Sequence, residues 1–187
     1  MLRSISRNLF LLTVVSSTLP SLGASQSAAI RQLEAEKEAV ELISRLENVG
    51  RDVHYNANRL NSFRGSDRIS EWTYDHYLRQ IRSLVQEGLR PALQRLAEIR
   101  PRLPDWQQDS IDLMFSPAQA LSADANSAAL SGRKAGASSP FLNSDLRRLL
   151  AKIYDHAQTL VETSDAAEDY AAAHQLALET GLKTLRP

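Results

Sequence analysis

Residues 39–60 read AVELISRLENVGRDVHYNANRL, and nearly every side chain that recurs at alternating intervals of three and four along them is apolar. The recurring set is Ala39, Leu42, Leu46, Val49, Val53, Asn56 and Leu60. Because an α-helix has 3.6 residues per turn, this spacing places the whole set on one face of a helix. The face is widened by Ile30, Leu33, Val40 and Ile43. The pattern predicts an amphipathic helix over residues 27–62.

Three more segments have the same periodicity, at residues 67–100, about 105–130 and about 144–184. The second contains Pro91, which removes a backbone donor and is expected to kink the helix or to split it just before the proline.

Short polar residues mark where these helices start and end. Ser66 or Ser70 is expected to cap the second helix and Asp105 the third. Residues 131–140 are rich in Ser, Gly and Ala and are predicted to form a flexible linker. No strand-like alternation competes with the helical patterns. The prediction is therefore an all-α fold, an antiparallel up-down-up-down four-helix bundle that occupies residues 25–187 as one domain.

The N-terminus has the layout of a secretory signal peptide. Met1–Asn8 carries two arginines and no acid, Leu9–Val15 is a short apolar run, and a small, polar stretch follows. The apolar run is far below the roughly 20 residues that span a bilayer. We expect residues 1–24 to be removed, by cleavage after Gly23 or Ala24. The prediction is a periplasmic or secreted protein with no transmembrane segment after removal of the signal.

Composition excludes several classes of function. The 187 residues include no Cys, which excludes disulfides, thiolate zinc sites, iron–sulfur clusters, covalently attached haem and a Cys nucleophile. The formal net charge is zero, so nothing indicates a nucleic-acid partner. No Gly-x-Ser-x-Gly motif is present, and no residue is assigned a catalytic role. An enzymatic activity is not indicated.

Histidine is the one nitrogen ligand type that could hold a metal here. His54 and His76 each lie eleven residues from Gly65, so a turn centred there would place them at the same height of an antiparallel hairpin. The pair is a candidate site for a divalent transition metal; the alternative is two histidines at the boundary of the core. His174 lies on the apolar face of the last helix, where a hydrogen bond across the core is expected.

Met114 and His156 form a second candidate pair. Both lie about twenty residues from the centre of the predicted linker, near Gly136, so a hairpin would place them at nearly the same height. Met and His are an axial ligand pair for haem, and four-helix bundles of the cytochrome b562 kind hold haem b in this way. A chance coincidence of heights is the alternative.

Aromatic side chains gather near the first predicted turn. They are Tyr55, Phe63, Trp72, Tyr74 and Tyr77. They could line a pocket for a flat ligand or close the end of the bundle as a plug.

Three segments carry a resemblance to known proteins: His54–Phe63 (HYNANRLNSF), His76, and Trp106–Asp112 (WQQDSID). At these segments the chain resembles a group of exported helical proteins of soil bacteria that have no assigned activity. The resemblance implies an exported helical bundle and carries no cofactor or ligand with it. In size and helix content the chain also resembles small periplasmic helical chaperones, although it lacks their Leu-Thr-x-x-Gln pattern.

These observations favour an exported protein with a binding or structural role and no cofactor, acting on an unidentified periplasmic protein or small ligand. A binding role predicts that an apolar strip stays exposed after folding. The alternative is a periplasmic bundle that binds a metal or haem b.

Overall fold

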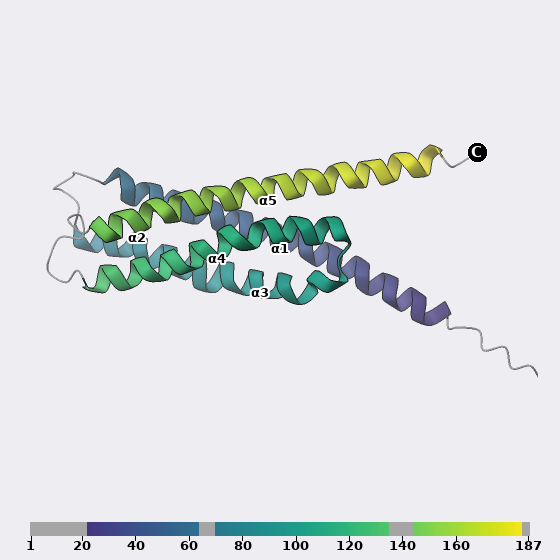
Figure 1. Ribbon diagram of the computed structural model, residues 1–187, viewed down its shortest axis with the longest axis horizontal. Helices are drawn as coiled ribbons and strands as arrows, with labels where there is room; N and C mark the ends of the chain where they lie inside the picture. The colour runs from purple at the N-terminus through teal and green to yellow at the C-terminus, as the bar shows by residue number, and fades with distance from the viewer. Residues whose placement is uncertain (1–21, 64–69, 135–143, 185–187) are drawn as a thin grey trace, which may run out of the picture.

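In the computed structural model, the residues described are 22–63, 70–134 and 144–184, and they are almost entirely helical with no strand among them (Figure 1). The elements are α1 (Leu22–Ser62), α2 (Glu71–Ser83), η1 (Leu84–Leu89), α3 (Arg90–Ile99), η2 (Arg100–Arg102), α4 (Asp105–Lys134) and α5 (Ser144–Thr184). Since α2, η1 and α3 follow one another without a break, the described chain forms four long helical rods. The predicted all-α four-helix fold is confirmed.

The rods pack in a ring around one core. α1 contacts the α2–α3 rod on one side and α5 on the other, and α4 contacts both of these neighbours. Fully buried side chains from all four rods fill the centre, among them Leu46, Leu96, Met114 and Ile153. None of the described helices combines the length and apolarity that a membrane span requires.

The second rod changes its helical type just before Pro91. Residues Leu84–Leu89 form a π-helix, in which the Arg90 amide donates to the Val85 carbonyl five residues back. Proline has no amide hydrogen and its ring crowds the carbonyl four residues earlier, that of Glu87. The wider π turn relieves this conflict, and Arg45 Nη2 donates to the Glu87 carbonyl at 3.2 Å. The rod is therefore not split at Pro91, and the irregularity expected just before the proline takes the form of a π segment.

Two glycines allow α1 to lie close to its neighbours. A Cβ added at Gly88 would lie 2.7 Å from Val49 Cγ2, and one added at Gly50 would lie 3.0 Å from Val161 Cγ2. Both distances are shorter than ordinary carbon–carbon contact. Val49 and Gly50 are adjacent, so α1 is tightly held by η1 and by α5 at this one level.

Several predicted boundaries need correction. α1 begins at Leu22, before the predicted start at residue 27, and so includes the end of the predicted signal peptide; residues 1–21 lie outside the described part. α4 continues to Lys134, so the first four residues of the predicted linker, 131–134, are helical, and the rest of it lies outside the described residues. Ser70 caps α2, as one of the two predictions had it.

Asp105 does not cap α4, because the Pro104 carbonyl accepts the first helical amides, from Gln107 and Gln108. Asp105 is instead the first helical residue, where a carboxylate is favourable.

Candidate functional site

The two predicted metal ligands lie against aromatic rings. The His54 ring is 4.1 Å from the ring of Tyr154 on α5. The His76 ring stacks on Trp72 at 5.5 Å and meets Tyr77 edge-on at 5.5 Å. Within the described residues, no group of three or more His, Asp or Glu side chains is arranged to hold a metal ion. The structure therefore adds no support to a metal site at His54 and His76.

The predicted haem ligands do not lie at the same height. Met114 is fully buried and its sulfur accepts from Ser164 Oγ at 3.3 Å, whereas His156 Nε2 lies 3.3 Å from Asp124 Oδ2. These two contacts set the antiparallel register of α4 and α5. They place Met114 opposite Ser164, eight residues or about 12 Å along the helix from His156. The expectation of equal heights is wrong because α5 begins only at Ser144, which moves the centre of the connection past Gly136.

The predicted aromatic pocket residues are divided between the surface and the core. Tyr55 and Trp72 are exposed, Phe63 and Tyr77 are half-buried, and Tyr74 is buried. The rings of Phe63 and Tyr77 are 5.8 Å apart, and Tyr55 accepts from Arg59 Nε at 3.1 Å. The arrangement is a row of ring contacts along α2 and the end of α1. The existence of a pocket among these rings stays a prediction.

A groove lies at the opposite end of the bundle, which we call the open end. This end holds the start of α1, the turn between α3 and α4, and the last part of α5 (Figure 1). There α1 and α5 extend past the turn and diverge. The groove has a volume of about 470 Å³ and is lined by Leu33, Glu36, Lys37, Val40, Pro104, Trp106, Gln107, Ala171 and His174. Its volume lies in the range of ligand-binding clefts.

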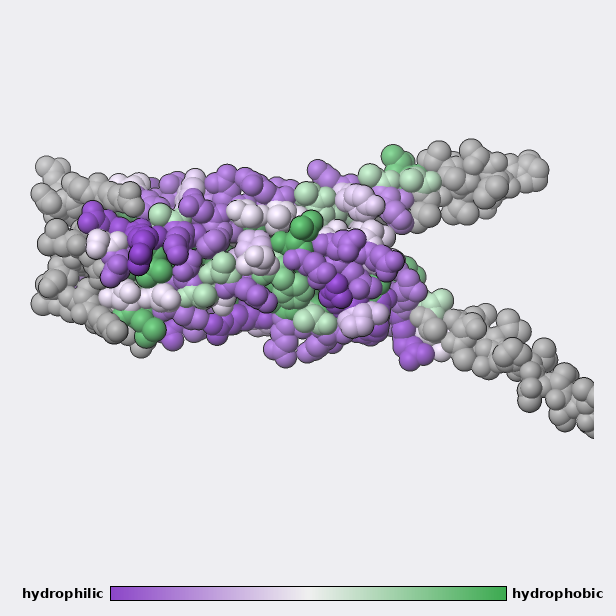
Figure 2. Space-filling view, in the orientation of Figure 1, coloured by the Kyte–Doolittle hydropathy of each residue, from purple (hydrophilic) through white to green (hydrophobic). Residues whose placement is uncertain are grey.

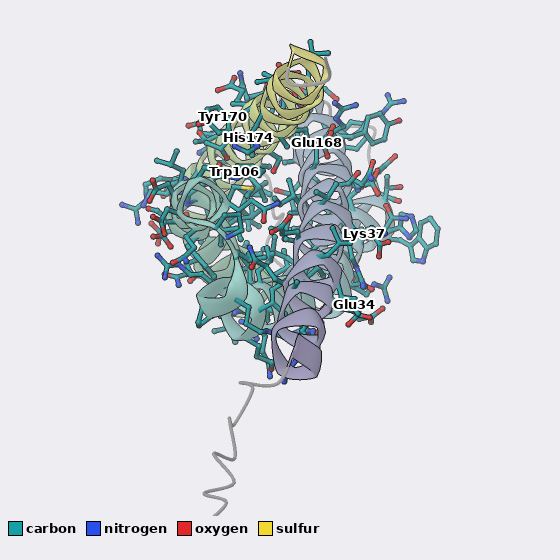
Figure 3. All side chains as sticks on the ribbon, turned by 90° about the vertical axis from the view of Figure 1, so that its right-hand side faces the viewer. Glu34, Lys37, Trp106, Glu168, Tyr170 and His174 are labelled. Carbon is teal, nitrogen blue, oxygen red and sulfur yellow. The ribbon has the colours of Figure 1, made fainter. Side chains whose placement is uncertain are left out.

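Three rings cluster at the groove, and two of them, Trp106 and His174, line it. Trp106, in the first turn of α4, lies 5.1 Å from the His174 ring and 5.5 Å from the Tyr170 ring, both on α5. Figure 3 shows the three residues gathered on the same side of the open end. The expected hydrogen-bonded core histidine is instead a half-buried ring in a stack. Pro104 ends the preceding turn and starts α4, which places Trp106 at this level.

One of the residues that line the groove, Gln107, has a buried amide oxygen. Gln107 is only 3% exposed, and its amide oxygen has no hydrogen-bond partner among the described residues. Leaving such a group unpaired costs about 1–3 kcal/mol. Unpaired buried polar groups are uncommon in folded proteins. One that adjoins a cavity is therefore a candidate contact for a ligand.

Apolar side chains remain exposed around the groove, as a binding role predicts. On α1 they are Ile30, Leu33 and Val40, of which the last two line the groove. Leu176 on α5 is also exposed, but it lies about 200° around the helix from His174 and so faces away from the groove. Figure 2 shows apolar side chains among the polar ones near the described ends of both helices. The sequence predicts that Ile30, Leu33, Val40 and Ile43 all widen the buried face of α1. Only Ile43 is buried, since α5 no longer covers α1 from Val40 toward its N-terminus.

The segments of α1 and α5 at this opening are rich in acidic residues. Residues 30–41 and 165–176 together hold seven carboxylates and two basic side chains, Arg31 and Lys37. Arg95 neutralises Glu38, with Nη2 2.9 Å from Oε2, and holds the pKa of that carboxyl below its usual value. Arg51 pairs with Asp165 at 3.3 Å. Counting Arg95 and Arg51 together with the two segments leaves a net charge of −3, although Arg51 also pairs with Glu47.

A carboxyl cluster lies next to the groove, between α1 and α5. Glu47 is buried, pairs with Arg51, and lies close to Asp165 and Glu168. Burial raises the pKa of Glu47; Arg51 opposes this rise, and the two neighbouring carboxylates add to it. The cluster joins α1 to α5 just before the helices diverge.

A smaller hollow of about 330 Å³ lies on the α1–α5 face near His54 and Tyr154. It is more open than the groove and is lined by the charged side chains Arg51 and Glu162 besides these rings.

No family model, curated protein or solved structure matches this chain, so the assignment of a site depends on the geometry of the described residues.

Proposed function

We propose that the protein is an exported binding protein and that the groove at the open end is its binding site. The observation that carries the proposal is the exposed apolar strip beside a cavity of about 470 Å³. Soluble proteins seldom leave contiguous apolar surface beside a cleft unless something binds there. Export is supported by the predicted signal peptide at residues 1–24.

Fluorescence of Trp106 tests the site directly. The chain has two tryptophans, and the other one, Trp72, is exposed in α2, so a Trp72→Phe variant makes Trp106 the single reporter. The probe is N-phenyl-1-naphthylamine, a neutral apolar dye that brightens when it leaves water. We expect energy transfer from Trp106 to the bound dye.

Two alanine positions control for where the dye binds. Ala171 lines the groove, and Ala171→Phe should fill it and abolish the transfer. Ala123 is exposed on α4, away from the groove, and Ala123→Phe should change nothing. Dye binding that Ala171→Phe leaves intact, or no binding to the Trp72→Phe protein, would contradict the proposal.

Export has its own test. Protein recovered from the periplasm of an expressing bacterium should begin at Ala24 or Ser25, which are the residues after the two predicted cleavage bonds. Recovery from the cytoplasm with residue 1 still present would refute the export part alone.

A further inference from the structure

The walls of the groove have the spacing that a helix offers to another helix. On α1 the exposed apolar residues Ile30, Leu33 and Val40 follow one another at intervals of three and seven, and on α5 Ala171 and His174 lie three apart. These intervals keep each set on one face. Two helices that diverge beside a shared groove, one with apolar side chains and the other with a small residue and a ring toward it, resemble the receiving side of a helix-in-groove contact.

The charge around the groove selects the partner. Glu36 and Lys37 line the groove itself and balance each other, whereas the two helix segments beside it carry a net charge of −3. Apolar residues with flanking Lys or Arg would match this pattern, whereas apolar residues with flanking Asp or Glu would meet like charge. A second copy of this chain is disfavoured as the occupant, because two open ends brought together would place acidic segments against each other.

We propose that the groove receives the apolar face of a cationic amphipathic helix of a partner protein. This inference rests on the proposed function, because it names the partner of the same site. Leucine-type side chains of the partner would enter the groove beside Trp106, and its basic side chains would lie near Glu34, Glu36 and Glu168. Figure 3 places Glu34 on α1 and Glu168 on α5 at this end of the bundle.

A matched pair of peptides tests the inference. Both have the same leucine pattern over about four helical turns; one has lysine and the other glutamate at every polar position. Labelled with a dye, each is titrated with the full mature protein and followed by fluorescence anisotropy. We expect the lysine peptide to bind at least about tenfold more tightly at low salt, and the difference to shrink in about 0.5 M NaCl, where surface charges are screened.

Two leucine variants separate apolar contact from charge alone. Leu33→Asp adds a carboxylate within the groove, and Leu130→Asp adds one at a similarly exposed leucine of α4; the two leucines are 53% and 59% exposed. Docking in the groove predicts that Leu33→Asp weakens the lysine peptide about tenfold or more and that Leu130→Asp does not. A lysine peptide bound more tightly by both variants would show charge attraction without docking and would overturn the inference.

The remaining outcomes are also decisive. Equal affinity for both peptides overturns the inference but leaves the proposed function standing if the neutral dye still binds. If neither the dye nor the peptides bind, the proposed function fails as well. Sedimentation equilibrium that shows a dimer broken by Leu33→Asp and unchanged by Leu130→Asp would assign the groove to a second copy instead. Circular dichroism melts confirm that each variant is folded before it is used.

Discussion

The contact between Gly88 and Val49 gives a sharp prediction about stability. In an ordinary helix Gly→Ala is stabilising by up to about 1 kcal/mol, because alanine restricts the unfolded chain and suits a helix. Here the new Cβ would lie 2.7 Å from Val49 Cγ2. Val49 is buried and branched at Cβ, so its single preferred rotamer in a helix leaves it little freedom to move aside.

The expected magnitudes follow from this geometry. Overpacking costs about 1–3 kcal/mol, so Gly88→Ala should be net destabilising by about 1 kcal/mol. Val49→Ala alone should cost about 2 kcal/mol, since it removes two buried methyl groups and leaves a void. In the Val49→Ala background the Cβ that Gly88→Ala adds enters that void, and the substitution should then be stabilising by about 1 kcal/mol.

A double-mutant cycle measures this reversal. Urea unfolding of the four proteins, followed by circular dichroism, gives the free energy of unfolding of each. The coupling energy between the two sites should be about 2 kcal/mol, favouring the double variant. Additive effects, or a Gly88→Ala protein more stable than the wild type, would refute the close approach of α1 and η1.

Three further predictions concern other parts of the molecule. Because the pKa of Glu47 is raised in the folded state, the stability it contributes is full at low pH and is lost as pH rises through that pKa; melts from about pH 4 to pH 8 should show a decline that Glu47→Gln removes. Arg45→Met should cost about 1 kcal/mol in urea unfolding, because the Glu87 carbonyl loses its donor; no loss would mean that water replaces Arg45. Haem added to the protein should give no Soret band that depends on Met114 and His156, which are about 12 Å apart along the bundle, and a band lost in His156→Ala would contradict the register.

The helical faces could be predicted from sequence because they depend on local periodicity. On the second rod, Tyr74, Leu78, Ile81 and Val85 are all buried as the 3.6-residue pattern requires. The heights of residues on different rods could not be predicted in the same way. They depend on where each connection turns, and an error of a few residues in its centre displaced Met114 from His156 by two helical turns.

The groove could not be predicted, because apolar residues at helical spacing can either fill the core or remain exposed beside a groove. Ile30, Leu33 and Val40 look like core residues in the sequence, and they would be buried if α5 continued to cover α1. The turn between α3 and α4 ends two of the rods earlier than the other two, which is a property of the whole fold. One signal was present, since the apolar face of α5 passes from Ala167 to the polar ring of His174 where burial ends.

Nuclear magnetic resonance of the isotopically labelled protein, titrated with the lysine peptide, tests the central claim most directly. If the groove is the binding site, the amide chemical shifts that change during the titration should belong to residues 30–40, 104–107 and 171–176, which come from three separate parts of the chain. Leu33→Asp should remove these changes. Shifts confined to the aromatic residues near Trp72, or no shifts at all, would show that the groove at the open end is not the binding site.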